Sequence, residues 1–213
     1  MDADFSIELG PPSEEAVLEY PWASPAETGP AYFDLKRQPE LLPFIAEAVQ
    51  YPELGEFLRV VNSDRSPFAT AKCDVWSTDE LDPAEDIYGG DWKLACYVDL
   101  VFSDGYLAER FSFFHHEDLV RSLTELLKKA PEIPAACEAV VRRCYYHQPP
   151  PGEASTSQTV PDDGTGLHAG FYFTLYLSGY GEDEEMARQR WQVTLRLVAN
   201  ALLQLSGKSA NKH

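Results

Sequence analysis

The sequence predicts an α+β protein, a two-layer sandwich in which a four-stranded, mainly antiparallel sheet carries its helices on one face. Three observations lead to this fold class. Several segments alternate apolar and polar residues with the period of a strand. Others repeat apolar residues at helical spacing. The first three strand segments follow one another through short connections, which favours antiparallel pairing.

Composition limits what the chain can bind. Its 213 residues suit one domain, and its 35 Asp and Glu against 17 Lys and Arg give a formal net charge of −18. Binding to nucleic acid or to an anionic membrane requires basic patches, so the sequence predicts neither partner. No phosphate-binding loop, nucleophile motif or metal-ligand spacing stands out, and no cofactor is predicted.

The N-terminal residues and the cysteines favour a cytoplasmic protein. The first twelve residues lack the basic and apolar regions of a signal peptide, and no apolar stretch approaches the ~18 residues of a membrane span. Without a secretion signal, buried free thiols are expected in a reducing compartment. The four cysteines are Cys73, Cys96, Cys137 and Cys144.

Residues 1–35 form an acidic arm with five prolines, eight acidic side chains and no Lys or Arg. The prolines break long elements, so we expect at most a short helix near 14–19. Exposing Phe5 and Trp22 fully to solvent would be unfavourable. We therefore expect the arm to lie on the body of the protein or on a second subunit, followed by a single α+β domain at 36–207.

The first half of this domain reads as two helices and a strand. Residues 38–51 have Pro39 in the first turn and an apolar stripe, and Pro52 separates them from a second helix at 53–61. Residues 68–77 alternate as a strand does, with Ala69, Ala71, Cys73 and Val75 on one face. The acidic stretch 79–91 is interpreted as a loop.

A β-hairpin is the central element of the prediction. Two apolar runs, Leu94–Phe102 and Tyr106–Phe114, flank an Asp-Gly pair, which favours a two-residue turn. This register places Asp99 directly opposite Arg110, an arrangement that stabilises a sheet by roughly 0.2–1 kcal/mol.

The second half is predicted to contain three helices and one strand. Leucines at helical spacing indicate a helix at 117–130, and Pro134 opens another that extends to His147. The polar stretch 148–169 is a long loop, interpreted as a surface loop or a lid. A strand at 170–178, a long helix from 182 to 207 and a basic tail at 208–213 complete the chain.

The face of the sheet opposite the helices is the candidate functional surface. It combines aromatic side chains with balanced charge, and interface centres are enriched in aromatic residues and Arg. A solvent-exposed face and a ligand site are the alternatives. The predicted interaction residues are Lys72, Asp74, Trp76, Tyr97, Asp99, Arg110, Tyr172 and Tyr176.

Three further groups of residues resemble metal-binding or catalytic sites but have simpler structural explanations. Cys137, Cys144 and His147 share a face of the predicted helix, yet a fourth zinc ligand is missing. The stretch 79–91 lacks the spacing of a calcium loop. His115 and its neighbour His116 are expected to act at a helix start, and would be the first catalytic suspects, with Asp99 and Arg110, only if the chain were an enzyme.

The predicted order of elements, a helix, three strands, a helix, then a strand and a helix, resembles that of bacterial secretion chaperones. These proteins are also small, acidic and dimeric. The additional helix and the long loop depart from their layout. The resemblance is one of layout alone, since no residue motif carries it.

We therefore predict a non-enzymatic, acidic, cytoplasmic interaction module such as an adaptor, chaperone or inhibitor. It would bind a protein partner or a second copy of itself, as a homodimer, through the aromatic sheet face. The alternative is a small-molecule-binding protein or an enzyme, with its site between that face and the loop 148–169.

Overall fold

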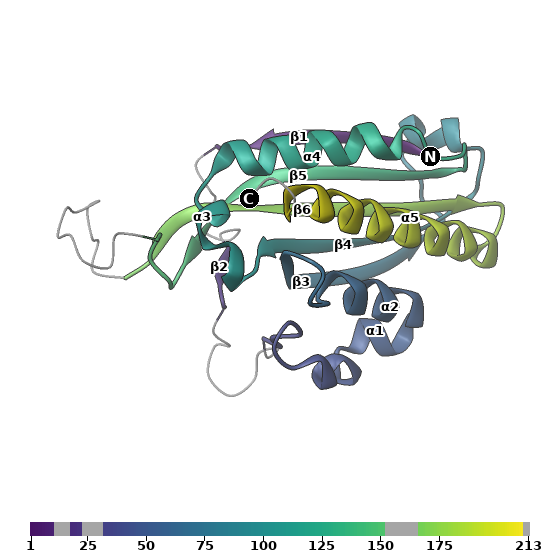
Figure 1. Ribbon diagram of the computed structural model, residues 1–213. Coiled ribbons are helices and arrows are strands. Elements are labelled where there is room, and N and C mark those ends of the chain that lie inside the picture. Colours follow the sequence, from purple (N-terminus) through teal and green to yellow (C-terminus); the bar gives the residue numbers. More distant parts are fainter. Residues whose placement is uncertain (11–17, 23–31, 152–165, 211–213) are drawn as a thin grey trace.

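The computed structural model describes residues 1–10, 18–22, 32–151 and 166–210, with the side chains of 207–210 excepted. Within these residues the protein is an α+β structure with one mixed sheet (Figure 1). The predicted class is therefore right, but the sheet has more strands than the four expected.

The sheet contains six strands in the order β1-β5-β6-β4-β3, with the short β2 also paired to β5. β1 and β2 run parallel to β5, and the other pairs are antiparallel. β1 and β3 are therefore the outermost strands. The strands are β1 (Asp2–Glu8), β2 (Leu18–Tyr20), β3 (Phe68–Thr78), β4 (Trp92–Phe102), β5 (Ala135–Tyr146) and β6 (His168–Gly181).

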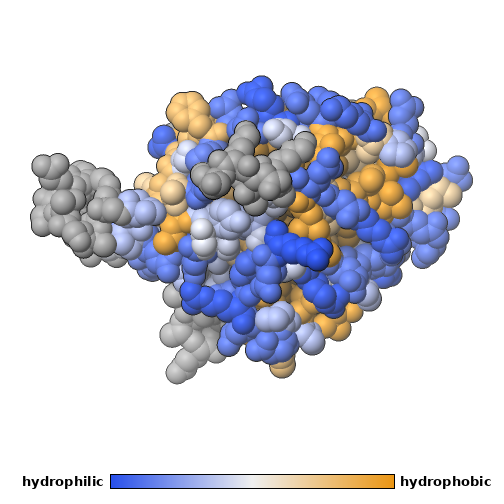
Figure 2. Space-filling view, in the orientation of Figure 1, coloured by the Kyte–Doolittle hydropathy of each residue, from blue (hydrophilic) through white to orange (hydrophobic). Residues whose placement is uncertain are grey.

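The long helices α4 and α5 cover one face of the sheet, and α1 and α2 lie beside β3 (Figure 1). Seen from this side, the surface is mostly hydrophilic, and hydrophobic residues gather between α4 and α5 (Figure 2). The α-helices are α1 (Ala46–Gln50), α2 (Pro52–Val61), α3 (Leu107–Arg110), α4 (Phe113–Leu127) and α5 (Glu184–Ala210). The 3₁₀ helices are η1 (Pro39–Phe44), η2 (Pro83–Tyr88) and η3 (Asp104–Tyr106).

The main core lies between the sheet and these helices. Its largest fully buried side chain is Trp191 of α5, which packs among the inward residues of β4, β5 and β6. Gly179 lets α5 approach the sheet closely, because a Cβ there would lie 2.2 Å from the backbone nitrogen of Trp191. α5 also packs against α2 and α4, which accounts for the apolar residues around much of its circumference.

The predicted hairpin is wrong in its second half. β4 forms as expected, but residues 106–114 turn into η3, α3 and the start of α4 instead of pairing with it. Ser112 acts as the N-cap of α4, since its Oγ accepts a hydrogen bond from the amide of His115. Consequently β4 pairs with β3 and β6, and Asp99 lies opposite Lys72 and Thr174.

The helix predicted at 134–147 is also wrong, because these residues form β5, which lies in the sheet between β1 and β6. Cys137 and Cys144 therefore point to opposite faces, Cys137 into the main core and Cys144 to the other side. The zinc arrangement considered for them does not form. The element order behind the resemblance to secretion chaperones is likewise not the observed order.

The other elements follow the prediction more closely. The strands expected at 68–77 and 170–178, and the helices expected at 53–61 and 117–130, form with shifted ends. The first residues of the expected arm belong to the sheet as β1 and β2. A helix near 14–19 falls largely outside the described residues, as do most of the loop at 148–169 and the end of the tail at 208–213.

Candidate functional site

Among the described residues, the helix-free face of the sheet is covered at both ends and partly exposed between them. At one end, residues that follow β2 pack on the sheet. At the other end, η2 does so. Val101 on β4 and Tyr172 on β6 belong to a second, smaller cluster that is separate from the main core, so they mark this face. Because side chains alternate along a strand, every second residue from them lies on the same face.

The first cover comes from the N-terminal part of the chain. Tyr20 and Leu18 are buried in the smaller cluster, and the Tyr32 hydroxyl donates to the Tyr20 hydroxyl at 2.7 Å. Trp22 extends the cover to the far edge of the sheet, where its indole Nε1 donates to the backbone oxygen of Ala71 at 3.0 Å. The described part of the arm thus lies on the body of the protein here, which is one of the two placements expected.

Arg110 closes this end of the sheet. Its guanidinium donates to the Phe102 carbonyl (2.6 Å), to Asp104 (2.8 Å) and to Gln148 (2.8 Å). The same group lies over the ring of Tyr146 and that of Tyr20. Arg110 is only 1 % exposed and has no free donor face for a partner. Its predicted place beside Asp99 is therefore wrong, and its role is structural.

The second cover is η2, whose Tyr88 ring stacks on Tyr180 with centroids 4.1 Å apart. Glu85 of η2 accepts from the Tyr180 hydroxyl at 2.7 Å and pairs with Lys93. Asp82 caps η2, because its side chain accepts from the Ala84 amide while its own amide donates to Glu85. Two acidic residues of the stretch 79–91 thus have capping partners.

Between the two covers lies a set of side chains that we call the central strip. They come from four adjacent strands. The central strip comprises Lys72, Asp74, Trp76, Tyr97, Asp99, Glu138, Arg142, Thr174 and Tyr176.

A β-bulge at Ala71 determines which β3 side chains join the central strip. The pairing register shifts between Thr70 and Lys72, so the side-chain alternation changes face at this point. Ala69 and Ala71 lie with the smaller cluster, whereas Cys73 and Val75 pack toward the main core. The four had been predicted to share one face, which holds only on each side of the bulge.

A hydrogen-bonded chain of polar groups runs through the middle of the central strip. Thr174 Oγ1 donates to Asp99 Oδ1 at 2.6 Å and accepts from Arg142 Nη1 at 2.8 Å. Arg142 also donates to Glu8 at 2.8 Å and to the Tyr176 hydroxyl at 3.2 Å. This chain links β1, β5, β6 and β4 on one face.

Burial raises the pKa of the acid in this hydrogen-bonded chain. Asp99 is 7 % exposed, and desolvation raises its pKa to about 6 despite the hydrogen bond from Thr174 and the nearby charges of Arg142 and Lys72. Burial, followed by the charge of Asp99, raises the pKa of Tyr97 to about 12. Burial lowers the pKa of Arg142, but its bonds to Glu8 and Tyr176 leave that pKa above the usual value.

The aromatic residues of the central strip are accessible to different degrees. Trp76 is 37 % exposed, and Tyr97 and Tyr176 are half-buried with ring centroids 6.4 Å apart. Tyr172, also predicted as an interaction residue, is only 5 % exposed beneath the first cover. Six of the eight predicted residues therefore lie together in the central strip, and Arg110 and Tyr172 do not.

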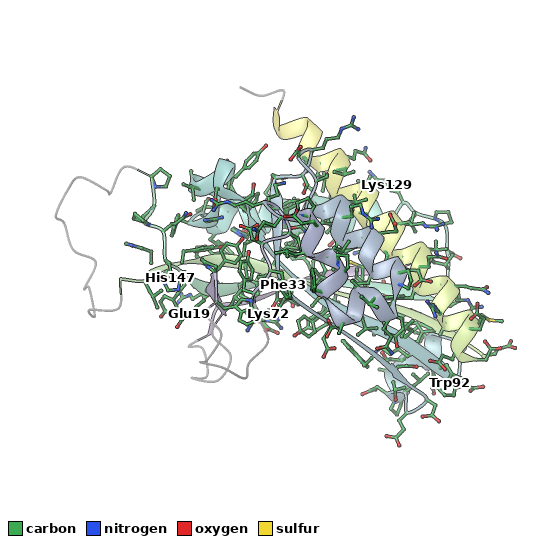
Figure 3. All side chains as sticks on the ribbon, turned by 90° about the horizontal axis from the view of Figure 1, so that it is seen from below. Glu19, Phe33, Lys72, Trp92, Lys129 and His147 are labelled. Carbon is green, nitrogen blue, oxygen red and sulfur yellow. The ribbon has the colours of Figure 1, made fainter. Side chains whose placement is uncertain are left out.

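A hollow of about 430 Å³ opens beside β3, where the central strip meets the first cover. Figure 3 labels two of its lining residues, Phe33 and Lys72. Lys72 forms part of its wall, with its ammonium group 5.8 Å from the centre of the Trp22 ring. The hollow is lined by Trp22, Phe33, Ile45, Glu47, Leu58, Thr70, Ala71, Lys72, Cys73, Asp74 and Tyr97.

Some of these participants were not predicted from the sequence. Arg142 and Glu138 were missed because their segment was interpreted as a helix. The capping pattern of Asp82 followed three residues later by Glu85 signals a helix start and could have located η2. Nothing local in the sequence indicates that Trp22 reaches β3.

The histidines considered as catalytic candidates do not form a site with Asp99. His116 is fully buried among Phe102, Phe171 and Phe173 on the helix side, opposite to the side of Asp99. Burial lowers its pKa to about 4, so it is neutral at pH 7. Exposed His115 lies in the first turn of α4.

Among the described residues, no group of three or more His, Cys, Asp or Glu side chains is arranged to hold a metal ion. No helix in the same residues is both long and apolar enough to span a bilayer.

Comparison with known proteins found no family model, no curated protein and no solved structure that matches this chain.

Proposed function

We propose that this chain is a protein-interaction module that docks a partner on the central strip and the adjoining hollow. The observation that carries the proposal is the partly exposed stretch of sheet between two covers, with Trp76 exposed and two tyrosines accessible beside it. Tyr and Trp are enriched at the centres of protein interfaces. An adaptor, chaperone or inhibitor would each use such a surface.

The charges of the central strip support binding rather than chemistry. Asp99 and Arg142 are connected through Thr174, and Arg142 pairs with Glu8, so their polar atoms hold one another in place. Paired, preorganised charges contribute specificity to an interface more than affinity. The net charge of −18 favours a partner with a basic surface.

The test is recovery of a partner that depends on the strip. The tagged full chain is isolated from its native cells beside a Trp76→Ala variant, and copurifying proteins are quantified. The control is Phe114→Ala, because Phe114 is 78 % exposed at the start of α4 and lies outside the strip. We expect one protein that the wild type and the control retain and Trp76→Ala loses by at least roughly tenfold.

Direct binding must then be reconstituted from the purified protein and the purified partner. A set of copurifying proteins that is the same for all three chains would contradict the proposal. Homodimerisation is the other form that this function can take. Light scattering over a range of protein concentrations tests it, and a dimer that Trp76→Ala dissociates would identify the partner as a second copy.

A small-molecule site is the second candidate, and the hollow is the observation that favours it. Its volume of about 430 Å³ falls within the usual range for ligand pockets. It lies beside β3, and residues 148–151 and 166–169 are not part of its lining, in contrast to the site expected near that loop. Thermal-shift screening of the wild type against Tyr97→Ala would detect a ligand bound there.

A further inference from the structure

β3 is an outermost strand. Among the described residues it pairs only with β4, which leaves part of its outer side open, and Figure 3 views the molecule from the side of this edge. The amide of Val75 points outward, because it donates to the carboxylate of the preceding Asp74 at 2.8 Å. Strand amides alternate between the two sides, so those of Cys73 and Ser77 also point outward. No side-chain acceptor for either is present among the described residues.

The opposite edge of the sheet is better protected. On β1, the amides of Ala3 and Phe5 donate to the carboxylates of the preceding Asp2 and Asp4, at 2.9 and 2.8 Å. A carboxylate that accepts from an outward amide takes up the donor that an added strand would use. Among the described residues, the stretch from Cys73 to Ser77 has such an acceptor only at Val75. The two edges of the sheet therefore differ in how many of their outward amides have a side-chain acceptor.

The hollow lies at one end of this open stretch. Cys73 and Asp74 belong to both, and the remaining wall includes apolar side chains of the arm and of the α1 region, such as Phe33 and Ile45. An open edge with a pocket beside it is the arrangement by which proteins bind peptides as added strands. The edge supplies backbone hydrogen bonds, and the pocket selects a side chain.

The charges around the edge indicate what such a peptide must carry. Exposed carboxylates of Asp74, Asp79 and Glu80 follow one another along β3 and just beyond it, and Glu47 lines the hollow. Lys72 is the opposing cation, and it lies over the Trp22 ring. The balance is acidic, so Lys or Arg in the peptide would be complementary.

We infer that the edge of β3 from Cys73 to Ser77 accepts an extended, Lys- or Arg-containing segment of a partner protein as an added strand. An apolar side chain of that segment would occupy the hollow. The inference rests on the proposed function and specifies the partner chemistry and the binding mode.

The test removes one outward donor without touching the β3–β4 ladder. An added strand would replace the Asp74 carboxylate on the Val75 amide. Proline lacks this amide proton and is tolerated on edge strands where the amide faces solvent, so Val75→Pro blocks strand addition. Ala3→Pro is the matched control, because it removes an equivalent outward amide from β1. Circular dichroism and thermal unfolding check that both variants keep the fold.

The probe is a phage-displayed library of random twelve-residue peptides, selected on the immobilised full chain. We expect enriched peptides that alternate basic and apolar residues. Their affinity, measured by fluorescence polarisation, should fall at least tenfold in Val75→Pro and stay within twofold in Ala3→Pro. Enriched peptides that bind Val75→Pro as well as they bind the wild type would overturn strand addition.

A charge variant keeps the inference testable if Val75→Pro does not fold. In Asp79→Lys/Glu80→Lys, affinity for the basic peptides should fall by roughly an order of magnitude and its salt dependence should weaken. Unchanged affinity and salt dependence would refute the charge requirement. A concentration-dependent dimer that Val75→Pro dissociates would also overturn the inference, since the occupant would then be a second copy.

This failure is distinguishable from failure of the proposed function. A partner that Trp76→Ala loses but Val75→Pro retains would refute strand addition and leave the interaction role standing. A partner that neither variant affects would refute both.

Discussion

Asp99 is a carboxylic acid buried within a face that is otherwise partly exposed. Its alternation along β4 identified it from the sequence as a residue of that face. Its neighbours could not be predicted in the same way, because they depend on which strands pair with β4. The sequence favoured Arg110 as its partner, and the actual neighbours, Lys72 and Thr174, come from β3 and β6.

The raised pKa of Asp99 makes the stability of the protein depend on pH. Its folded-state pKa of about 6 exceeds the unfolded value of about 3.9. Between these values the folded chain holds a proton that the unfolded chain has released, so stability falls as the pH rises from about 4 to about 6. The contribution lost is about 3 kcal/mol, from a shift of about two pH units.

Asp99→Asn removes this titration. Denaturant unfolding at pH 4.5 and pH 7.5 should therefore show the variant gaining about 2 kcal/mol over the wild type between the two conditions. Asn can still accept the hydrogen bond from Thr174, which keeps the local geometry similar. A difference between the two proteins that is the same at both pH values would show that Asp99 does not titrate in this range.

Arg110 gives a second prediction at the residue scale. Arg110→Met keeps the apolar stem but leaves the Phe102 carbonyl, Gln148 and Asp104 without their shared donor. We expect a loss of about 2–4 kcal/mol in the free energy of unfolding, measured by urea titration. Arg37→Met is the control, since Arg37 also pairs with Asp104 but is 67 % exposed, and it should leave stability unchanged.

The elements that the sequence misassigned share a physical cause. Residues 106–114 and 134–147 are short apolar runs, and such runs fit a buried helix or a strand almost equally well. The strand conformation of β5 depends on its neighbours, because β1 pairs with one of its sides and β6 with the other. The helical conformation of the segment 106–114 depends on two contacts. Ser112 caps α4, and the Arg110 side chain donates a hydrogen bond to the Phe102 carbonyl.

Longer and more regular segments were assigned correctly. β6, α4 and α5 each keep one period over their length, and β3 does so on each side of its bulge, which identifies them without knowledge of the tertiary structure. The central strip follows the same rule. Its residues on β3, β4 and β6 were predicted, and those on β5 were not.

The contact of α5 with β6 provides a prediction at the scale of elements. In Gly179→Ala the new Cβ would lie 2.2 Å from the Trp191 nitrogen and 2.5 Å from the Ala187 oxygen, both in the α5 backbone. The helix would have to move away from the sheet, which should cost about 3 kcal/mol or more.

Gly105→Ala is the matched control, because a Cβ there meets nothing within 4 Å. Thermal unfolding should show a large decrease in Tm for Gly179→Ala and little change for Gly105→Ala. Equal Tm values for the two variants would mean that α5 is less closely packed than its backbone contacts indicate.

At the scale of the whole molecule, composition predicts the net charge but not the order in which the strands pair. The acidic balance is a property of the sequence alone, whereas the placement of β1 and β2 on β5 depends on contacts more than a hundred residues apart. The arm had been expected to lie against the body or against a second subunit. Residues 2–8 alternate polar and apolar side chains, which indicates a strand, but no local pattern shows that this strand joins β5, because pairing with a distant strand leaves no periodic signal beyond the strand itself.

The net charge of −18 should make the folded chain sensitive to salt. Like charges repel more strongly in the compact state, and added salt screens that repulsion. We expect Tm to rise by roughly 2–8 °C between low salt and about 0.5 M NaCl, equivalent to about 1–2 kcal/mol. Differential scanning calorimetry in NaCl and in choline chloride separates screening from specific effects of sodium, and a flat or falling Tm would contradict the prediction.

The same screening should act with opposite sign on the two processes that this charge controls. Salt that stabilises the free chain should weaken the docking of a basic segment at the β3 edge, because the attraction is screened together with the repulsion. Tm and peptide affinity measured in one salt series should therefore move in opposite directions. If affinity rose together with Tm, apolar contacts in the hollow would dominate binding, and the acidic edge would have no part in choosing the partner.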